Sequence, residues 1–338
     1  MGGRVNATPM MRAGIVGAGW IGRRHAETLA GRDGVVVAGV CDTDGGRAAQ
    51  VAGASGARVF SDWREMLETA ALDMLWVCTP PRAHAGPAVA ALERGLPVYL
   101  EKPVARSADD AARIVSAAER GQAVCAVGYQ WRAVDVLGDL RSALAGRTVG
   151  CLVAQSIGGT ESRPWFLSKA EGGGNLLERG SHQIDLARVL AGEVVAVQAA
   201  ESAVRLAAHP KSPGADDITD AVTIVLHFGS GGIGTIVVAW TSGNLPASYW
   251  VEITAADAAF RLDLDPDFRL SGVAGSSQVA ATAHGKPFDG SVARFLAAAK
   301  AGDPGLVFCT PADGARTLAV AIAAEEALRS GATVPVAA

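Results

Sequence analysis

Near its N-terminus the chain reads Arg12-Ala13-Gly14-Ile15-Val16-Gly17-Ala18-Gly19-Trp20-Ile21-Gly22. The run up to Val16 is mostly apolar and predicts a buried β-strand, and a helical pattern follows Gly22 to about Ala30. The glycines have G-x-G-x-x-G spacing between a strand and a helix, which is the context that a dinucleotide-binding turn requires.

Each glycine of this turn has a separate physical role. Gly17 permits the tight turn, Gly19 lets a pyrophosphate approach the backbone, and Gly22 lets the helix pack on the strand. Free N–H groups at the helix N-terminus would bind the phosphates. Together with Trp20 and Ile21, these glycines are the predicted phosphate-binding turn.

An acidic residue follows the next apolar run. Val35 to Val40 predicts a second strand, and Asp42 stands 20 positions after Gly22 (42 − 22), where an acid holds the hydroxyls of the adenosine ribose. Asp42 and Asp44 would repel a 2′-phosphate and no arginine immediately follows Asp42, so we expect NAD rather than NADP. Asp42 could also cap the next helix, which is compatible with the ribose role.

The alternation of strands and helices continues through the first 130 residues. Six short apolar strands alternating with helices predict a doubly wound parallel sheet. The polar residues and glycines that interrupt this pattern fall at the carboxyl ends of strands: Gly17, Asp42, Thr79, Lys102 and Tyr129. In open α/β sheets that edge is where ligands bind, so it is the predicted site.

The most unusual of these strand ends is Glu101-Lys102-Pro103, which follows the strand Val98–Leu100. Pro103 biases Lys102 away from helical backbone and holds it extended. An ordinary surface Glu–Lys pair is the alternative interpretation. His84, after the Thr79-Pro80 turn, is a candidate on the cofactor side, and a structural role fits it equally.

From residue 148 the pattern changes to longer, alternating strands. They are predicted at residues 148–157, 194–204, 218–228, 233–240, 249–254 and 259–264. We interpret them as a meander of antiparallel strands in a second, α+β domain, with helices at 134–145, 287–300 and 311–329. The predicted boundaries are 12–130 and 131–338, and residues 1–11 resemble a disordered leader.

A second group of polar residues lies inside this domain. Gly172, Gly173 and Gly174 lead into a helical segment in which Glu178, His182 and Asp185 share one face by their i, i+4, i+7 spacing. A carboxylate beside an imidazole fixes its tautomer and raises its basicity, which suits a general base that takes a hydroxyl proton while hydride leaves the same carbon. A merely solvated helix face is the alternative. With one imidazole, no metal site is expected.

Composition excludes several classes of protein. The chain has 338 residues, 49% of them hydrophobic and 19% charged, and a net charge of −4, which fits a soluble globular protein that does not bind nucleic acid. The five cysteines are scattered, without a Cys-x-x-Cys pair. No run of about 18 apolar residues predicts a membrane span, so a reducing cytoplasm is expected.

Taken together, these motifs resemble the Gfo/Idh/MocA oxidoreductase family. The resemblance rests on the glycine turn with Asp42, Cys78-Thr79-Pro80-Pro81 with His84, Glu101-Lys102-Pro103, and Gly172-Gly173-Gly174 followed by Glu178, His182 and Asp185. It implies a Rossmann domain followed by an α+β domain with an open-faced, mostly antiparallel sheet, which often forms an oligomer interface.

The resemblance also implies residue roles. Lys102 would bind the substrate oxygen near the nicotinamide and His182 would be the acid/base, while Glu178 stands where many members have an aspartate that is one methylene shorter. Thr79, Pro80, His84 and Glu101 join the predicted cofactor site, together with Lys102. Residues expected at the substrate are Tyr129, Arg132, Trp165 in the loop Arg163-Pro164-Trp165-Phe166, Asn175 and Asp185; for an aromatic in that loop, packing is the alternative.

The predicted function is NAD(P)-dependent transfer of hydride between nicotinamide and a carbinol or carbonyl of a sugar, sugar derivative or cyclic polyol. The substrate is expected in the cleft between the domains, in a protein that forms a homo-oligomer. A cofactor-binding sensor on the same fold, or a reductase of an imine or non-sugar carbonyl, are the alternatives.

Overall fold

The computed structural model of the chain describes residues 10–159, 163, 165–166, 168–202, 220–241, 246–265 and 267–337. They form two compact units. The first contains residues up to Glu101, Ala112–Gly128 and Arg294–Pro311, and the second contains Lys102–Ala111, Tyr129–Ala293 and the residues from Ala312 on. Residues 102–111 and 294–311 therefore depart from the single boundary predicted after residue 130. Residues 1–9 of the predicted leader lie outside the described residues.

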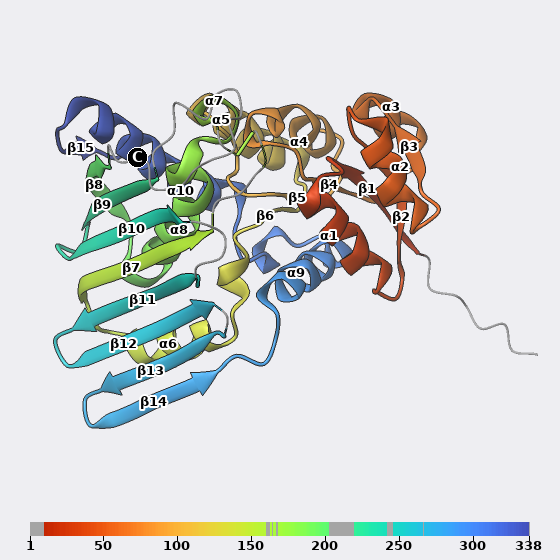
Figure 1. Ribbon diagram of the computed structural model, residues 1–338. Coiled ribbons are helices and arrows are strands. Elements are labelled where there is room, and N and C mark those ends of the chain that lie inside the picture. The colour runs from red at the N-terminus through yellow and green to blue at the C-terminus, as the bar shows by residue number, and fades with distance from the viewer. Residues whose placement is uncertain are drawn as a thin grey trace, which may run out of the picture. The chain divides into compact units, whose positions relative to one another are not determined.

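A parallel sheet forms the centre of the first unit (Figure 1). Its strand order is β3-β2-β1-β4-β5-β6 and every neighbouring pair is parallel, which confirms the doubly wound sheet. The strands are β1 (Met11–Val16), β2 (Val35–Cys41), β3 (Arg58–Phe60), β4 (Met74–Val77), β5 (Val98–Leu100) and β6 (Cys125–Val127). β3 was not located from the sequence, because two of its three residues are exposed and so give no apolar run.

Helices connect these strands. They are α1 (Trp20–Ala30), α2 (Gly45–Gly53), α3 (Trp63–Thr69), α4 (Ala85–Leu92) and α5 (Ala108–Gly121), with short 3₁₀ turns at Pro81–Ala83 and Pro304–Leu306. α5 and α9 (Pro287–Ala301) each begin in the second unit and continue into the first.

Three fully buried aromatic side chains anchor the centre of this unit. Trp76 on β4 stacks on Tyr99 of β5 with their ring centroids 6.0 Å apart. Phe295 on α9 packs its edge against both rings, at 5.1 and 5.6 Å. This packing fixes β5, and with it the strand end from which the Glu101-Lys102-Pro103 stretch departs.

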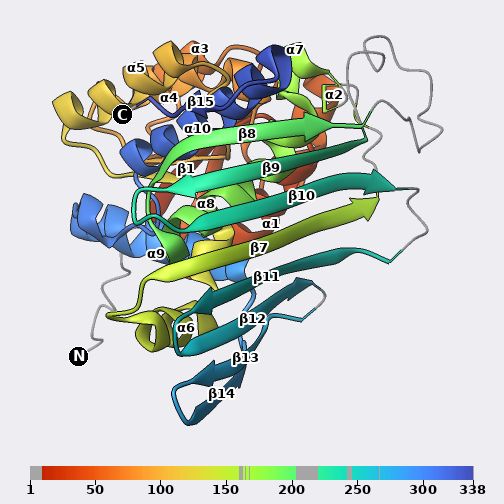
Figure 2. The ribbon, with the colours of Figure 1, turned by 90° about the vertical axis from the view of Figure 1, so that its left-hand side faces the viewer.

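The second unit is built on a sheet with strand order β14-β13-β12-β11-β7-β10-β9-β8-β15 among the described residues (Figure 2). The strands are β7 (Val149–Gly159), β8 (Val194–Glu201), β9 (Ala221–Phe228), β10 (Ile233–Thr241), β11 (Ser248–Ala255), β12 (Ala258–Asp265), β13 (Arg269–Ala274), β14 (Ser277–Thr282) and β15 (Val334–Pro335). The predicted strands 194–204 and 218–228 each extend into residues outside the described part.

The sheet is mostly antiparallel, as predicted, but it is not a simple meander. β7 comes first in the chain and lies between β11 and β10, antiparallel to β11 and parallel to β10. Pairing between distant strands leaves no signature in local alternation, which is why the sequence suggested a meander. β13, β14 and β15 were not predicted, because small and polar residues dominate the first two and β15 has only two residues.

Helices cover one face of this sheet. α6 (Val136–Leu144), α8 (Ser181–Ala191) and α10 (Pro311–Ser330) lie behind it in Figure 2, and α7 (Lys169–Gly172) lies at one end. The opposite face carries no helix among the described residues (Figures 1 and 2). Along β9, buried residues alternate with half-buried ones, which is the pattern of a sheet packed on one side. No helix in the described ranges is long and apolar enough to cross a membrane.

Candidate functional site

The glycine turn after β1 has the geometry that the sequence predicts. Gly17 has φ +97°, and a Cβ atom there would lie 2.5 Å from the carbonyl oxygen of Cys78. A Cβ on Gly22 would lie 1.9 Å from the carbonyl oxygen of Gly17. A Cβ on Gly19 would meet nothing within 4 Å. Gly17 and Gly22 are therefore needed for the turn itself, whereas Gly19 leaves its backbone accessible, as pyrophosphate binding requires.

The N-terminus of α1 is free to bind an anion. Its N-cap, Gly19, supplies no side-chain acceptor, and Trp20 at the first helical position is 59% exposed. Unsatisfied N–H groups and the positive end of the helix dipole favour phosphate oxygens. The turn therefore fits the phosphates of a dinucleotide.

Asp42 is held against this turn by three hydrogen bonds. Its Oδ2 accepts from the amide of Ala18 at 2.7 Å, and its Oδ1 accepts from the amide of Asp44 at 2.8 Å and from Arg47 at 2.9 Å. Burial alone would raise the pKa of Asp42, but these hydrogen bonds lower it overall. The carboxylate stays ionised and has an acceptor position left for a ribose hydroxyl.

Two features near Asp42 were missed from the sequence. The helix N-cap is Asp44, which accepts from the amides of Gly46 and Arg47, so Asp42 is not the cap. Arg47 reaches back one turn of α2 to Asp42, although it is five positions later in the chain. No arginine immediately follows Asp42 in the sequence, but Arg47 lies beside its carboxylate in space.

The remaining candidates of the first unit are braced by histidines. His84 is fully buried and its Nε2 bonds to the carbonyl oxygen of Thr79 at 2.8 Å, which stiffens the Thr79-Pro80 turn. Glu101 is 8% exposed, and its carboxylate lies 2.8 Å from Nε2 of His25, another fully buried histidine that the sequence gave no role. Both pairs shape the strand ends at the predicted cofactor site.

In the second unit, Lys102 is paired with Glu178. The Lys102 ammonium donates to Glu178 Oε1 at 2.5 Å and to the Glu178 carbonyl oxygen at 2.8 Å. Their side chains are only 13% and 10% exposed. A lysine this buried needs a charged partner, so Glu178 fixes both its position and its charge. The surface Glu–Lys interpretation is therefore wrong for Lys102.

Glu178, His182 and Asp185 do not form the predicted cluster. Glu178 lies in a π-helical turn, Leu176–Gly180, and the other two lie on α8. The wider turn changes the facing of Glu178 relative to α8. Among the described residues no hydrogen bond joins His182 to either carboxylate. Asp185 instead accepts from Arg132 at 2.7 and 2.8 Å and from Thr317 at 2.9 Å.

His182 is a neutral imidazole in this environment. Its pKa lies well below the ordinary value, first because of burial and then because of the positive charges of Lys102 and Arg179. Nδ1 is buried and has no hydrogen-bond partner in the described part of the chain, which leaves Nε2 as the nitrogen able to meet a ligand. A neutral imidazole accepts a proton, so His182 can act as a base.

Aromatic rings surround His182. Tyr129 is 1% exposed, with its ring edge-on to the imidazole at 5.9 Å. Trp131 in the 3₁₀ turn Gln130–Ala133 is closer, at 4.9 Å, and half-buried. The sequence singled out Tyr129 and missed Trp131, which no periodicity marks.

Three predicted substrate residues have structural partners. Asp185 is 2% exposed and holds Arg132. Trp165 packs on Phe166 at 5.5 Å, beside the fully buried Trp240, so the packing alternative describes it; Pro164 of the same loop lies outside the described residues.

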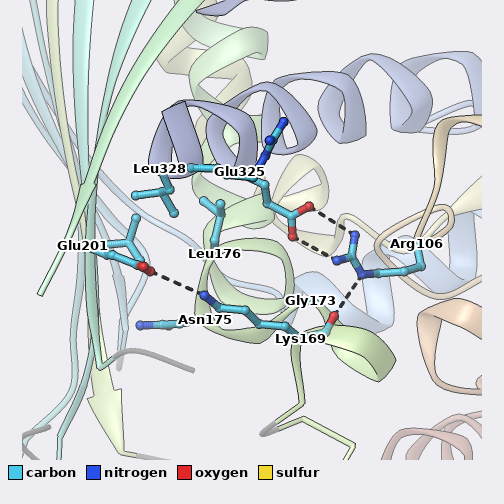
Figure 3. A pocket seen from close by; sticks show the side chains of 10 residues that line it. Arg106, Lys169, Gly173, Asn175, Leu176, Glu201, Glu325 and Leu328 are labelled. Atoms are coloured by element: carbon cyan, nitrogen blue, oxygen red, sulfur yellow. Dashed lines mark hydrogen bonds and ion pairs between the residues drawn. The ribbon is translucent and has the colours of Figure 1, made fainter. Parts of the chain in front are cut away.

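Asn175 faces a different space. Its amide donates to the carbonyl oxygens of Asp220 and Val238, at 3.0 and 3.4 Å. It lines a cavity of about 380 Å³ that includes neither Lys102 nor His182 and in which Lys169 approaches Glu201 and Arg106 pairs with Glu325 (Figure 3). Within the described ranges, no three His, Cys, Asp or Glu side chains are grouped to hold a metal ion.

Two family models match the chain. Residues 11–129 match an oxidoreductase family with an NAD-binding Rossmann fold, GFO_IDH_MocA, and residues 137–261 match the GFO/IDH/MocA C-terminal domain.

Curated relatives match over part of their length. The rhizopine catabolism protein MocA of Rhizobium meliloti is 31% identical over 54% of this chain and 57% of its own. Inositol 2-dehydrogenase 2 of Saccharopolyspora erythraea is 32% identical over 57% of each chain. Myo-inositol 2-dehydrogenase of Thermotoga maritima is 26% identical over 67% of each. The chain thus spans a little over half the length of the first two relatives.

Solved structures share the fold over nearly the whole chain. GenD2 from gentamicin A biosynthesis, in complex with NAD, has a TM-score of 0.82 at 23% identity and covers 98% of both chains. Levoglucosan dehydrogenase, in complex with NADH and levoglucosan, has a TM-score of 0.84 at 21% identity and covers 97% of this chain and 100% of that one.

The first prediction concerns Gly19. Gly19→Ala should fold normally, because its Cβ meets nothing, but should weaken NADH binding about tenfold or more, because the methyl group occupies the approach to the backbone. NADH fluorescence titration and a thermal melt measure the two effects. Gly53→Ala, whose Cβ also meets nothing, is the control and should bind NADH normally. Equal affinity in all three proteins would contradict the predicted turn.

The second prediction concerns the pKa of His182. The imidazole should titrate well below pH 6.5 in the wild-type protein, and Arg179→Gln should raise this pKa, because it removes a positive charge that disfavours protonation. NMR of the histidine ring protons across pH 4–8 measures it. Arg120→Gln, an exposed arginine paired with Glu93, is the control and should leave His182 unchanged. A wild-type pKa at or above the ordinary value would refute this electrostatic description.

Proposed function

Since the chain belongs to the Gfo/Idh/MocA oxidoreductase family, we propose that it is an NAD-dependent dehydrogenase acting on a carbinol of a sugar, sugar derivative or cyclic polyol. The observation that carries the proposal is the buried Lys102–Glu178 pair in the same cluster as a neutral His182. Relatives named as inositol dehydrogenases support the substrate class.

The chain's own residues divide the work of oxidation. Bound NAD supplies the acceptor for hydride. The Lys102 ammonium, held by Glu178, donates a hydrogen bond to the reacting substrate oxygen. Nε2 of His182 accepts the hydroxyl proton while the C–H bond breaks and the C=O bond forms. In the reducing direction His182 returns that proton. Positioning and charge complementarity lower the barrier.

Glu178 has a different task from the one predicted. It was expected to orient the imidazole, but its carboxylate binds Lys102. The longer glutamate side chain reaches the ammonium from a π-helical turn. We therefore assign Glu178 to the placement of Lys102, with the edge-on packing of the buried Tyr129 ring orienting His182.

A cofactor-binding sensor is the rival function, and the same pair argues against it. Burying a lysine, a glutamate and an imidazole together costs desolvation free energy. Catalysis explains why these residues are kept together, whereas binding a dinucleotide alone does not require them.

We also propose that the chain forms a homo-oligomer through the uncovered face of its second sheet. Half-buried apolar residues, among them Val153, Val225 and Val237, stand on that face of the central strands. Thr235, Gln155 and Thr223 stand beside these valines, and an uncovered sheet face of this mixed character is suited to pack against the same face of a second copy. No disulfide joins the five cysteines, all of which lie in the described part of the chain, and this supports a reducing cytoplasm as the location.

The third prediction tests the catalytic assignment. Absorbance at 340 nm should report NAD reduction by at least one cyclic polyol or sugar, with NAD preferred over NADP. Lys102→Ala and His182→Ala should each lower kcat/KM by roughly 10²–10⁴-fold, the usual size for a positioned proton-transfer group. NADH binding should persist in both variants, because the glycine turn and Asp42 remain to bind the phosphates and the ribose.

The matched controls are Lys300→Ala and His284→Ala, which alter exposed side chains. They should keep wild-type activity. Unchanged turnover in both the Lys102 and His182 variants would refute the assignment. Tight NADH binding without turnover of any substrate would favour the sensor.

The fourth prediction concerns assembly. Light scattering after size-exclusion chromatography should give at least a dimer mass. The double variant Val225→Glu/Val237→Glu should be monomeric, because burying two unpaired carboxylates in an interface is unfavourable. Gln50→Glu, at an exposed position of α2 in the first unit, serves as the charge control. A monomeric wild-type chain at micromolar concentration would contradict the proposed interface.

A further inference from the structure

The half-buried ring of Trp131 is the starting point. Buried tryptophans such as Trp76 complete a core, but Trp131 lies in a short 3₁₀ turn after β6, with its ring 4.9 Å from His182. An indole that is neither in the core nor fully exposed, beside the proposed base, is suited to contact a substrate.

Tyr249 supports this indole from the sheet. The two rings are 6.3 Å apart and steeply inclined at 70°, so one edge meets the other's face. Tyr249 is the second residue of β11 and lies opposite Ser156 of β7; because Ser156 is fully buried, Tyr249 points to the helix-covered face of the sheet. The pairing of β11 with β12 shifts register between Tyr249 and Trp250, an irregularity that is common beside functional sites.

Arg179 completes the arrangement. Its guanidinium lies 5.8 Å from the centre of the Tyr249 ring and donates to the carbonyl oxygens of Gly159 and Ala239, at 2.9 and 3.3 Å. The two hydrogen bonds fix the guanidinium of Arg179, and its cation–π attraction then holds the ring of Tyr249. Arg179 follows directly after Glu178 in the chain. The support of Trp131 by Tyr249 and Arg179, and the Lys102–Glu178 pair, therefore share one turn of the backbone.

Gly158 leaves the space that the side chains of Tyr249 and Arg179 occupy. A Cβ atom at this position would lie 2.5 Å from the Tyr249 hydroxyl and 3.1 Å from Nη1 of Arg179. Gly158 is the diagonal neighbour of Tyr249 across the β7–β11 pair, where side chains come within reach of each other. Any side chain there would displace both residues.

We propose that Trp131, held by Tyr249 and Arg179, is a stacking platform for the C–H face of a six-membered substrate ring. C–H bonds beside oxygen carry partial positive charge and are attracted to the negative face of an indole. Lys102 and His182 then contact a hydroxyl group at the edge of the same ring. An open-chain polyol has no flat face to offer, so the platform selects cyclic polyols and pyranoses. This inference rests on the proposed function and narrows its substrate class.

The kinetic test compares cyclic and open-chain substrates. Trp131→Ala should raise KM for myo-inositol and for methyl β-glucopyranoside about tenfold, with kcat changed far less, since stacking stabilises ground and transition states alike. Trp131→Phe should restore most of the affinity. KM for NAD and kcat/KM for sorbitol should stay within about twofold. Trp63→Ala, which removes a half-buried indole from α3, is the control.

A second pair of variants tests the support of the platform. Gly158→Ala should reproduce the rise in KM for cyclic substrates, because it displaces Tyr249 and Arg179. Gly150→Ala lies on the same strand, where a Cβ would meet only a carbonyl oxygen at 3.8 Å, and should behave as wild type. Equal losses for cyclic and open-chain substrates, or no loss for either, would overturn the platform.

A binding measurement separates this inference from the proposed function. Saturation-transfer NMR of myo-inositol with the NADH-loaded protein needs no turnover, and should show the strongest transfer to the C–H protons of one ring face, lost in Trp131→Ala. Saturation transfer to one ring face without any turnover supports the platform and refutes the proposed dehydrogenase activity. If the wild-type protein turns over cyclic substrates and the Trp131 variants have the same KM, the proposed dehydrogenase stands and the platform is refuted. The absence of saturation transfer from the wild-type protein also refutes the platform.

Discussion

A lysine ammonium buried beside one carboxylate constrains everything around it. Lys102 and Glu178 come from segments 76 residues apart, and each would be destabilising in its place without the other. Their pairing fixes the backbone after β5 relative to the π-helical turn within the second unit. It also commits Glu178 to the lysine, so that His182 is left as a neutral imidazole between positive charges and aromatic rings. The division of labour in the proposed reaction follows from that single contact.

The chain places its two chemical tasks on separate units. The glycine turn, α1 and Asp42 belong to the first unit and have the features that fit the phosphates and ribose of a dinucleotide. Lys102, Glu178, His182 and Trp131 belong to the second. The stretch Glu101-Lys102-Pro103 joins them along the chain: Glu101 is braced by His25 in one unit, and the next residue is the proposed substrate-binding lysine of the other.

Features formed by residues close together in the sequence could be predicted from it, whereas contacts between distant residues could not. The turn after β1 depends on local backbone geometry, so the spacing of Gly17, Gly19 and Gly22 predicted it, and strand–helix alternation predicted the parallel sheet. The insertion of β7 between β10 and β11, the pairing of Asp185 with Arg132, and the Trp131–Tyr249 contact join residues 53 or more positions apart, and no local pattern records them. The i, i+4, i+7 spacing predicted that Glu178, His182 and Asp185 share one helix face. That prediction assumes a regular α-helix, but Glu178 lies in a π-helical turn.

In the proposed reaction, hydride passes directly between a substrate carbinol and the bound nicotinamide. Incubating the protein with NAD and a cyclic polyol deuterated at its carbinol carbons, then analysing the NADH by mass spectrometry, tests this most directly. One deuterium is expected on the nicotinamide ring of the NADH formed, without loss of label to water, and this labelled NADH should form roughly 10²–10⁴-fold more slowly when Lys102 or His182 is replaced. NADH that forms without deuterium, or a labelled substrate that stays intact beside tightly bound NAD across a broad panel, would contradict it.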